Sequence, residues 1–372
     1  MTTTNTIARQ DLQQIMREMI DAGFVGVALR VNDEHGEWVD SAGVSELGTT
    51  AKPPVDAFVR VGSNTKTFTA TVVLRLVDEG RIDLDAPVLG YLPEFALDER
   101  ITVRMLLQHT SGVFNYTGEF YPDGTIVAGI PSTIAGKEWL DKRFDTYLPE
   151  DLVTLALAKP ARFEPGTDWS YSNTNYVIAR LLVEKVTGNS LAEEMRRLIF
   201  EPLGMTDTSC PGTSTELPEP HPHTYYRYLE GDEQHTVDIT EHNPSWISTG
   251  GDMISTTADL HTFITALVRG QLVPRPLLAE MYTTRATGIP NMDYGLGVFV
   301  LELDGGATVI THNGGMGGFG ALMFSTPDGN TTLTAYLTCV EDAEMSIAPA
   351  FQVAQKQLID AVFGGRADER AS

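Results

Sequence analysis

Cysteine, basic charge and long apolar runs are all scarce in this 372-residue sequence. Its two cysteines, Cys210 and Cys339, cannot form a disulfide framework, and a free pair fits a reducing compartment. Lysine and arginine together number 26 against 50 aspartates and glutamates, which gives a net charge of −24. Nucleic acids and anionic membranes bind basic surfaces, so we expect neither as a partner. We interpret the negative charge as a source of solubility.

The beginning of the sequence and its hydropathy pattern show no sign of export or membrane insertion. The segment MTTTNTIARQDLQQIM lacks the basic start and the apolar run of a signal peptide. No stretch approaches the roughly 20 apolar residues of a membrane span. We therefore expect a cytoplasmic protein, while noting that a protein with a trimmed leader would look the same.

Four histidines gather in a polar region between Pro211 and His242, where a metal site has to be considered. They are His221, His223, His235 and His242. No C-x-x-C or H-E-x-x-H spacing accompanies them. We predict neither a metal nor any other cofactor.

The order of apolar patterns predicts an α/β fold. Helical periodicity at residues 7–22 is followed by strand patterns at 24–31, 38–44 and 57–61 and by a helical run at 67–77. Strand patterns return at 295–303, 308–312, 318–325 and 331–337, before a last helix at 348–363. Turns at 304–306 and 328–330 are typical of hairpins, which makes the sheet antiparallel.

The middle of the chain has a different character. Helices are predicted at 102–109, 150–158, 173–187 and 191–199, whereas residues 112–136 are too irregular for a core strand. We therefore predict an α/β domain built from both ends of the chain, residues 1–80 and 245–365. An inserted, mostly helical domain would span residues 81–244, and residues 366–372 would form a polar tail.

One junction carries the strongest chemical signal. Ser63 lies between a strand-like run and the helix that begins near Thr67, and Lys66 follows one helical turn later. Lys66 alone among the lysines has a serine three residues before it. A serine hydroxyl becomes a good nucleophile when a neighbour takes its proton, and a desolvated lysine amine can do so. By itself, the S-x-x-K pattern would suit an N-capping serine beside a solvent-facing lysine equally well.

Two later motifs decide between these interpretations. Tyr171-Ser172-Asn173 and His312-Asn313-Gly314 follow Ser63-x-x-Lys66 in the order and approximate spacing of serine β-lactamases and penicillin-binding proteins. The segments VGSNTKTFTA and WSYSNTNYVIARLLVEKVTG resemble the class C β-lactamase-related group. Within that group they most resemble D-alanyl-D-alanine carboxypeptidases, D-amino-acid peptidases and family VIII esterases. The resemblance covers about residues 8 to 365.

This resemblance implies a fold and a set of roles. The fold is β-lactamase/transpeptidase-like, an antiparallel sheet flanked by helices with an inserted helical domain. Ser63 would become acylated, and Lys66 would take its proton. Tyr171 would relay a proton to the leaving group, and Asn173 would hydrogen-bond Lys66 and the substrate amide.

The third motif would complete the site. The backbone N–H groups of Ser63 and Gly315 would form an oxyanion hole, the latter on an edge strand ending at His312. His312 belongs to the catalytic set that the resemblance implies, and Asn313 and Gly314 to the substrate-binding set. Trp246 resembles a residue lining the substrate cleft, with a core tryptophan as the alternative. His109 lies outside the catalytic set of these relatives, and we interpret it as structural.

The third motif also departs from the usual Lys-Thr-Gly or His-Thr-Gly. Asn313 stands where a hydroxyl residue helps these relatives to hold a substrate carboxylate. A carboxypeptidase also needs a cation, but the strand Val298-Phe299-Val300 is uncharged. His312 or Arg60 could substitute, although a structural role suits Arg60 better. Substrates that end in a carboxylate are therefore in doubt.

The expected activity is that of a serine hydrolase with an acyl-enzyme on Ser63 and a small-molecule ester, amide or peptide as substrate. Acyl transfer to an amine remains open, because it would use the same acyl-enzyme. A β-lactam-binding protein with little turnover is a further alternative, against which the intact Tyr171 argues mildly. True β-lactamase activity is less expected, because the altered third motif weakens binding of the lactam carboxylate.

Overall fold

The computed structural model describes residues 3–121, 123–130 and 137–364. Its helices are α1 (Thr3–Asp21), α2 (Thr65–Asp78), α3 (Val103–Leu107), α4 (Lys137–Lys142), α5 (Pro149–Leu157), α6 (Asn173–Thr187), α7 (Leu191–Met195), α8 (Glu201–Leu203), α9 (Thr257–Val268), α10 (Arg275–Met281) and α11 (Ala348–Phe363). Its strands are β1 (Phe24–Asp33), β2 (Gly36–Gly43), β3 (Val59–Arg60), β4 (Gly118–Phe120), β5 (Ile126–Ala128), β6 (Tyr225–Glu230), β7 (Glu233–Asp238), β8 (Ile254–Ser255), β9 (Arg285–Ile289), β10 (Met292–Tyr294), β11 (Phe299–Glu302), β12 (Thr308–Met316), β13 (Phe319–Ser325) and β14 (Thr332–Glu341). The predicted tail at 366–372 and parts of the glycine-rich region (122 and 131–136) lie outside the described residues.

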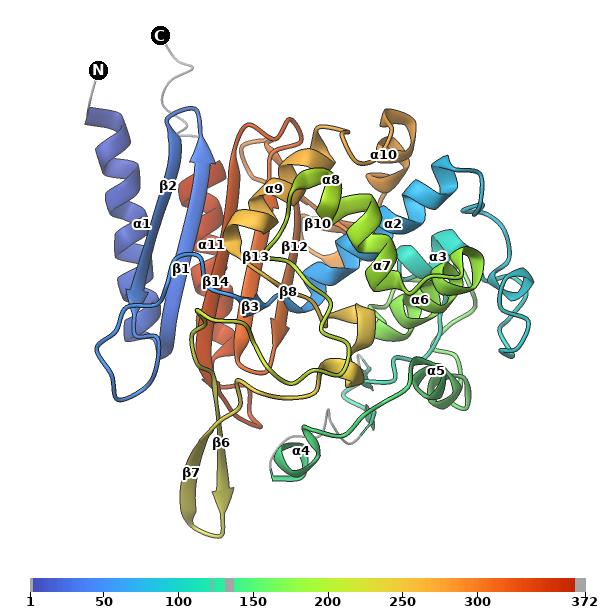
Figure 1. Cartoon of the computed structure of the whole chain (residues 1–372), viewed down its shortest axis with the longest axis horizontal. Coiled ribbons are helices and arrows are strands. Elements are labelled where there is room, and N and C mark those ends of the chain that lie inside the picture. The colour runs from blue at the N-terminus through green and yellow to red at the C-terminus, as the bar shows by residue number, and fades with distance from the viewer. Residues whose placement is uncertain (1–2, 122, 131–136, 365–372) are drawn as a thin grey trace.

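A large sheet forms the centre of the molecule (Figure 1). Its strands follow the order β2-β1-β14-β13-β12-β11-β10-β9, and the pairs along this path are antiparallel. The two ends of the chain meet in it, because β1 pairs with β14 from Phe24↔Cys339 to Asn32↔Thr332. From the middle of the chain, β6 adds to β14 in parallel. The sheet thus has the antiparallel character that the hairpin turns predicted.

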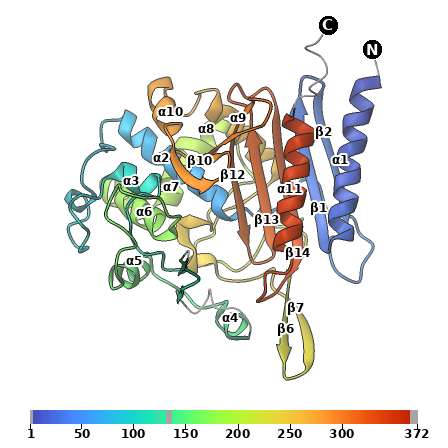
Figure 2. The ribbon, with the colours of Figure 1, turned by 180° about the vertical axis from the view of Figure 1, so that it is seen from behind.

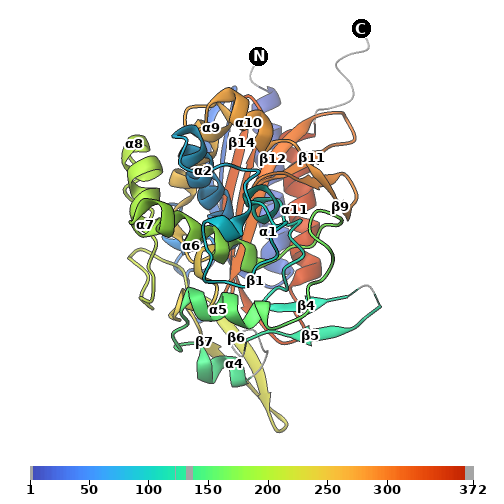
Figure 3. The same cartoon turned by 90° about the vertical axis from the view of Figure 1, so that its right-hand side faces the viewer.

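Helices cover both faces of this sheet, and each face buries its own apolar cluster. On one face α1 lies beside α11 (Figure 2), and Met16 of α1 packs in a cluster with Leu29 of β1 and Leu358 of α11. The other face carries α2 and α9, followed by the helices of the middle region (Figure 3). There Phe68 of α2 stacks on Phe263 of α9 with ring centroids 3.5 Å apart. The apolar stripe predicted at residues 7–22 is therefore the face that covers the sheet.

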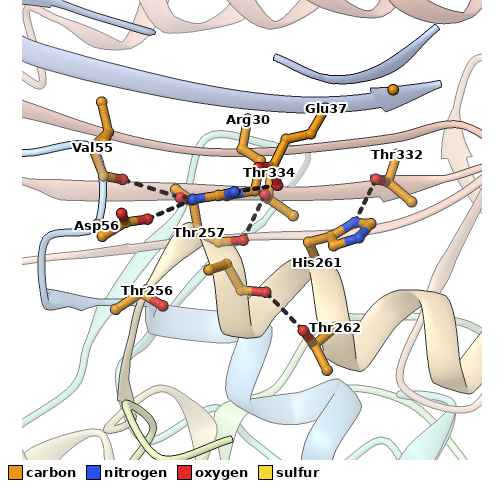
Figure 4. A network of polar contacts seen from close by, with 12 residues as sticks. Arg30, Glu37, Val55, Asp56, Thr256, Thr257, His261, Thr262, Thr332 and Thr334 are labelled. Carbon is orange, nitrogen blue, oxygen red and sulfur yellow. Dashed lines mark hydrogen bonds and ion pairs between the residues drawn. The ribbon is translucent and has the colours of Figure 1, made fainter. Parts of the chain in front are cut away.

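A polar network holds the start of α9 against the sheet (Figure 4). Arg30 of β1 pairs with Glu37 of β2 and with Asp56, and its Nε donates to Thr257 Oγ1. Thr334 of β14 donates to the carbonyl of Thr257 at 2.8 Å. Because a buried polar group without a partner is costly, these contacts fix where α9 begins on the sheet.

Two predicted strands differ from those observed. The run at 57–61 forms only the two-residue strand β3, which pairs with β8 outside the large sheet. The reason is local, since Val61 (φ −91°, ψ 0°) already turns into the 3-10 turn η1 (Gly62–Asn64). The strand predicted to end at His312 continues to Met316 and lies between β13 and β11, so it is not an edge strand there. Its pairing with β11 nevertheless stops at Thr311, which leaves the last residues of β12 open on that side.

The middle region, residues 81–244, contains α3 to α8 and the hairpins β4–β5 and β6–β7. Its division from the rest of the chain into a separate domain stays a prediction. Within the described residues, no helix is both long enough and apolar enough to cross a membrane.

Candidate active site

Ser63 lies where the turn η1 meets the end of β12. It is the middle residue of η1, and α2 begins two residues later, so Lys66 stands one turn beyond it. Gly62 has a φ of 52°, and a Cβ there would come within 2.5 Å of Gly315 N. A Cβ on Gly314 would come within 2.6 Å of Ser63 N. Both glycines are therefore required for the backbone around Ser63 to touch β12.

The Lys66 amine is fully buried, with three oxygen neighbours. Its Nζ lies 2.7 Å from Asn173 Oδ1, 2.5 Å from the Gly250 carbonyl and 3.1 Å from Ser63 Oγ. Burial lowers its pKa well below the usual value of a lysine. A neutral amine has two N–H donors and one lone pair. The two carbonyl oxygens use both donors, and the lone pair is left for the Ser63 hydroxyl.

Tyr171 completes a short chain of hydroxyl groups at this point. Burial raises the pKa of its phenol, while a hydrogen bond with Ser63 acts in the opposite direction. The phenol therefore keeps its proton at neutral pH. The Lys66 Nζ lies 4.8 Å from the centre of the Tyr171 ring. Tyr171, distant in sequence, is thus brought to Ser63 and Lys66, as the motifs predicted.

Asn173 is positioned by the start of α6 and by the loop before β4. It is the first residue of α6, and its backbone N–H donates to Asn115 Oδ1 at 3.0 Å. Its Nδ2 donates to Thr117 Oγ1 at 3.1 Å, which turns Oδ1 towards Lys66. The predicted contact between Asn173 and Lys66 is therefore present in the structure.

His312 is buried, and both of its ring nitrogens have partners within the protein. Nδ1 lies 2.7 Å from the Asn313 carbonyl, and Nε2 lies 3.3 Å from the Tyr294 hydroxyl. Burial, with a smaller contribution from Lys66, lowers the pKa of His312 to about 3. The imidazole is neutral at ordinary pH, with Nδ1–H donating to the carbonyl and Nε2 accepting from Tyr294. It therefore cannot supply the cation that the sequence analysis considered.

The other predicted residues of the third motif lie on different sides of β12. Gly314 packs against Ser63, and Gly315 is exposed beside Gly62. Asn313 points to the opposite face, where its Nδ2 donates to Gln355 Oε1 of α11 at 3.3 Å. This follows from the period of two along a strand. The structure thus brings Gly314 and Gly315 to Ser63 and keeps the side chain of Asn313 away from it.

Arg60 and Trp246 are both held by contacts within the protein. Arg60 is buried, and its Nη2 donates to the carbonyls of Thr215 and His242 at 2.8 and 3.1 Å. This is the structural role that the sequence favoured. Trp246 ends the turn Pro244–Trp246, is half-buried and packs against the main apolar cluster. Its predicted place in the substrate cleft stays a prediction.

Sequence reasoning did not predict several contacts of the central group. His109, interpreted as structural, is buried with its ring 4.3 Å from that of Tyr171, and its Nδ1 accepts from Ser172 N at 3.2 Å. The Gly250 carbonyl, which accepts from Lys66, belongs to a stretch that was considered only for Trp246. Tyr176 was treated as part of a helix. Its spacing of three residues from Asn173 on α6 was the available sign, since such residues share one helix face.

The histidines between Pro211 and His242 do not converge. Among the described residues, no three or more histidine, cysteine, aspartate or glutamate side chains are grouped as a metal would require. His242 is buried with its Nδ1 3.0 Å from the Ile239 carbonyl, and His223 pairs with Asp238.

Comparison with known proteins identifies the family of this chain. A model of the Beta-lactamase family matches residues 10–357. The structure of a D-stereospecific amidohydrolase from Streptomyces sp. superposes with a TM-score of 0.82 and 36% identity, covering 96% of this chain and 99% of that one. A D-amino acid amidase from Ochrobactrum anthropi SV3, in complex with L-phenylalanine amide, gives a TM-score of 0.80 and 25% identity over 95% and 98% of the two chains.

A curated relative, the putative penicillin-binding protein PbpX of Bacillus subtilis (strain 168), is 26% identical over 336 residues, 90% of this chain and 75% of that protein. Several other curated relatives are longer, and the match spans about half to two thirds of their length. The chain belongs to the Beta-lactamase family. The predicted β-lactamase/transpeptidase-like fold and the predicted class, a serine hydrolase, are both confirmed.

Proposed function

We propose that this protein hydrolyses amides or esters of amino acids, substrates without a free carboxylate, through an acyl-enzyme on Ser63. Lys66 takes the proton of the Ser63 hydroxyl as Oγ attacks the substrate carbonyl. Tyr171, which is protonated beforehand, donates its proton to the leaving group, and the ammonium of Lys66 then gives its proton to the Tyr171 phenolate, so that both groups regain their starting protonation. The N–H groups of Ser63 and Gly315 stabilise the oxyanion.

The observation that carries this proposal is the geometry of the Lys66 amine. Two carbonyl acceptors, Asn173 Oδ1 and Gly250 O, use both hydrogens of a neutral amine. The third neighbour is Ser63 Oγ, and burial lowers the pKa of the amine well below that of an ordinary lysine. A buried, oriented amine with a lowered pKa beside a serine hydroxyl is suited to act as the general base.

The charges near Ser63 support a substrate without a free carboxylate. Among the described residues, the three cation candidates nearest Ser63 are poorly suited to bind a carboxylate. Burial lowers the pKa of Lys66, His312 is neutral with both nitrogens paired, and Arg60 directs its Nη2 to two backbone carbonyls. A carboxylate left without a charged partner in a buried site loses about 1.5–3 kcal/mol of binding. D-Amino acid amides are the first candidates, because the two structural relatives named above are a D-stereospecific amidohydrolase and a D-amino acid amidase.

The test combines labelling with turnover. Intact-protein mass is measured after mixing with p-nitrophenyl acetate or benzylpenicillin, and D- and L-phenylalanine amide are assayed against a D-alanyl-D-alanine peptide that ends in a carboxylate. We expect an acyl adduct on Ser63 that is absent in Ser63→Ala. Ser172→Ala is the matched control, since Ser172 is a buried neighbour of Tyr171 whose Oγ has no hydrogen-bond partner. We also expect at least a tenfold preference in kcat/KM for the amide.

The outcomes separate this proposal from its alternatives. An adduct that persists in Ser63→Ala would show that another residue is acylated. A preference for the peptide carboxylate would contradict the substrate class. Acyl transfer predicts that an added amine diverts the product from acid to amide, and a penicillin adduct without ester or amide turnover would indicate a β-lactam-binding protein.

A further inference from the structure

The amine of Lys66 faces the rings of two tyrosines, of which only Tyr171 belongs to a motif. Its Nζ lies 4.8 Å from the centre of the Tyr171 ring and 5.6 Å from that of Tyr176. Both distances fall within the range in which an aromatic face attracts a cation. Tyr176 takes no part in the proton transfers proposed above, so a different role must account for its contact with Lys66.

Tyr176 is fixed by α6 and by its own hydroxyl. It lies three residues after Asn173 on this helix, so both side chains project towards Lys66. Its hydroxyl donates to the Leu107 carbonyl at 2.9 Å, and the side chain is fully buried. Because the hydroxyl is bound to Leu107, the ring rather than the hydroxyl is the part that faces the amine.

The reaction places a charge on Lys66 that its surroundings must stabilise. As the bond between Ser63 Oγ and the substrate carbon forms, the hydroxyl proton moves to Nζ, and the neutral amine becomes an ammonium. Burial makes this ion costly, because little water can solvate it. The Gly250 carbonyl and Asn173 Oδ1 accept two of its hydrogens. The ring faces supply the remaining favourable electrostatic contact.

We propose that Tyr176 is a positioning residue that acts through Lys66, its ring face stabilising the ammonium formed when Ser63 is deprotonated. This rests on the proposed role of Lys66 as the base. The ring raises the basicity of an amine that burial would otherwise weaken too far. Tyr176 therefore sets the strength of the base without exchanging a proton itself.

The other titratable groups near Lys66 have fixed charge states across the relevant pH range. Tyr171 and Tyr176 have pKa values raised by burial and stay protonated. His109 and His312 have pKa values lowered by burial and by Lys66, and both stay neutral. Asp252, two residues after Gly250, is the exception, because burial raises its pKa to about 7. A titration above about pH 5 is therefore assigned to Lys66 only where it is also seen in Asp252→Asn.

The experiment measures the ionisation of Lys66 directly, without substrate. The protein is labelled with ¹³Cε-lysine, the Lys66 resonance is assigned by its loss in Lys66→Gln, and its pKa is followed by NMR. The variants are Tyr176→Leu, which removes the ring, and Tyr176→Phe, which keeps the ring but loses the bond to Leu107. Tyr116→Leu is the matched control, because Tyr116 is equally buried and its hydroxyl donates to the Ile247 carbonyl at 3.0 Å.

We expect the pKa of Lys66 to fall by about one pH unit in Tyr176→Leu. It should stay within about 0.3 units of wild type in Tyr176→Phe and Tyr116→Leu. If Tyr176→Leu does not fold, phenylalanines of increasing fluorine content can be placed at position 176. They keep the shape of the ring but reduce the negative electrostatic potential of its face, so the pKa of Lys66 should fall stepwise. An unchanged pKa in either series would overturn the proposal.

Turnover distinguishes this inference from the function on which it rests. In a protein that shows Ser63-dependent turnover, the acid limb of kcat/KM should move to lower pH together with the NMR value. Absence of Ser63-dependent turnover with a shifted pKa would refute the proposed function but keep the ring contact. If Tyr176→Leu turned over normally and the acid limb of its kcat/KM profile did not shift, the role of Tyr176 would be refuted while the proposed function would stand.

Discussion

The contact between Gly314 and the turn of Ser63 gives the sharpest prediction. In Gly314→Ala, the new Cβ would lie 2.0 Å from the Val61 carbonyl oxygen and 2.6 Å from Ser63 N. Both neighbours are backbone atoms, which cannot rotate out of the way. The φ of Gly314 is not in the left-handed region, so alanine can adopt its backbone conformation. The effect of the substitution is therefore steric.

The size of the effect follows from these distances. An ordinary contact of a Cβ begins near 3.4 Å, so η1 and β12 must separate by more than about 1 Å. Overpacking of this kind costs about 1–3 kcal/mol of folding free energy. A displacement of about 1 Å between a nucleophile and its oxyanion donors can lower the rate about 100-fold. We therefore expect kcat/KM to fall about 100-fold through slower acylation, with a moderate loss of stability.

Three measurements test this expectation. Single-turnover acylation by a reactive ester gives the rate of the chemical step, steady-state kinetics give kcat/KM, and urea unfolding gives the free energy of unfolding. Gly305→Ala is the matched control, because nothing lies within 4 Å of a Cβ at that position. If Gly314→Ala acylated within threefold of wild type, the contact between β12 and the turn of Ser63 would not be what positions the nucleophile.

Three further substitutions test the base, a buried carboxyl group and the proton donor. Asn173→Asp places a carboxylate beside Lys66, which should raise the pKa of the amine by about 1–3 units and move the acid limb of kcat/KM to higher pH, opposite to Tyr176→Leu. Asp252 is buried, and burial raises its pKa to about 7, so the folded chain holds a proton that the unfolded chain releases near pH 4. Wild-type stability should therefore decrease from about pH 4 to pH 7, by up to about 4 kcal/mol, and urea unfolding of Asp252→Asn should lack that slope. Tyr171→Phe should lower the rate of leaving-group departure by about 10² to 10⁴, measured as the ratio of amide to activated-ester turnover, and an unchanged ratio would remove Tyr171 from proton donation.

Much of the site could be predicted from local patterns. The spacing of Ser63 and Lys66 on one helical turn and the order of the three motifs indicated which residues meet. The apolar stripe of α1 and the hairpin turns between the last strands indicated an antiparallel sheet with helices. Apart from the order of the motifs, which comes from the family resemblance, these features depend on residues near in sequence, whose periodicity is visible without coordinates.

Other features depended on contacts between distant segments. The direction of Asn313 follows from the register of β12, in which one residue of shift exchanges the two faces. The order of strands in the sheet placed β12 between β11 and β13, where the sequence had suggested an edge. The neutrality of His312 required its burial beside Tyr294, which no local pattern of the third motif contains.

The sequence by itself determined the nucleophile motif, the fold class and the serine hydrolase family, because these reside in residue identity and in periodicity along the chain. Only the tertiary structure decided that the pKa of Lys66 is lowered. That shift depends on complete burial, and two acceptors orient the amine, Asn173 from α6 and Gly250 from a segment far along the chain. Desolvation and partner geometry are properties of the assembled site, and they turn an ordinary lysine into a base.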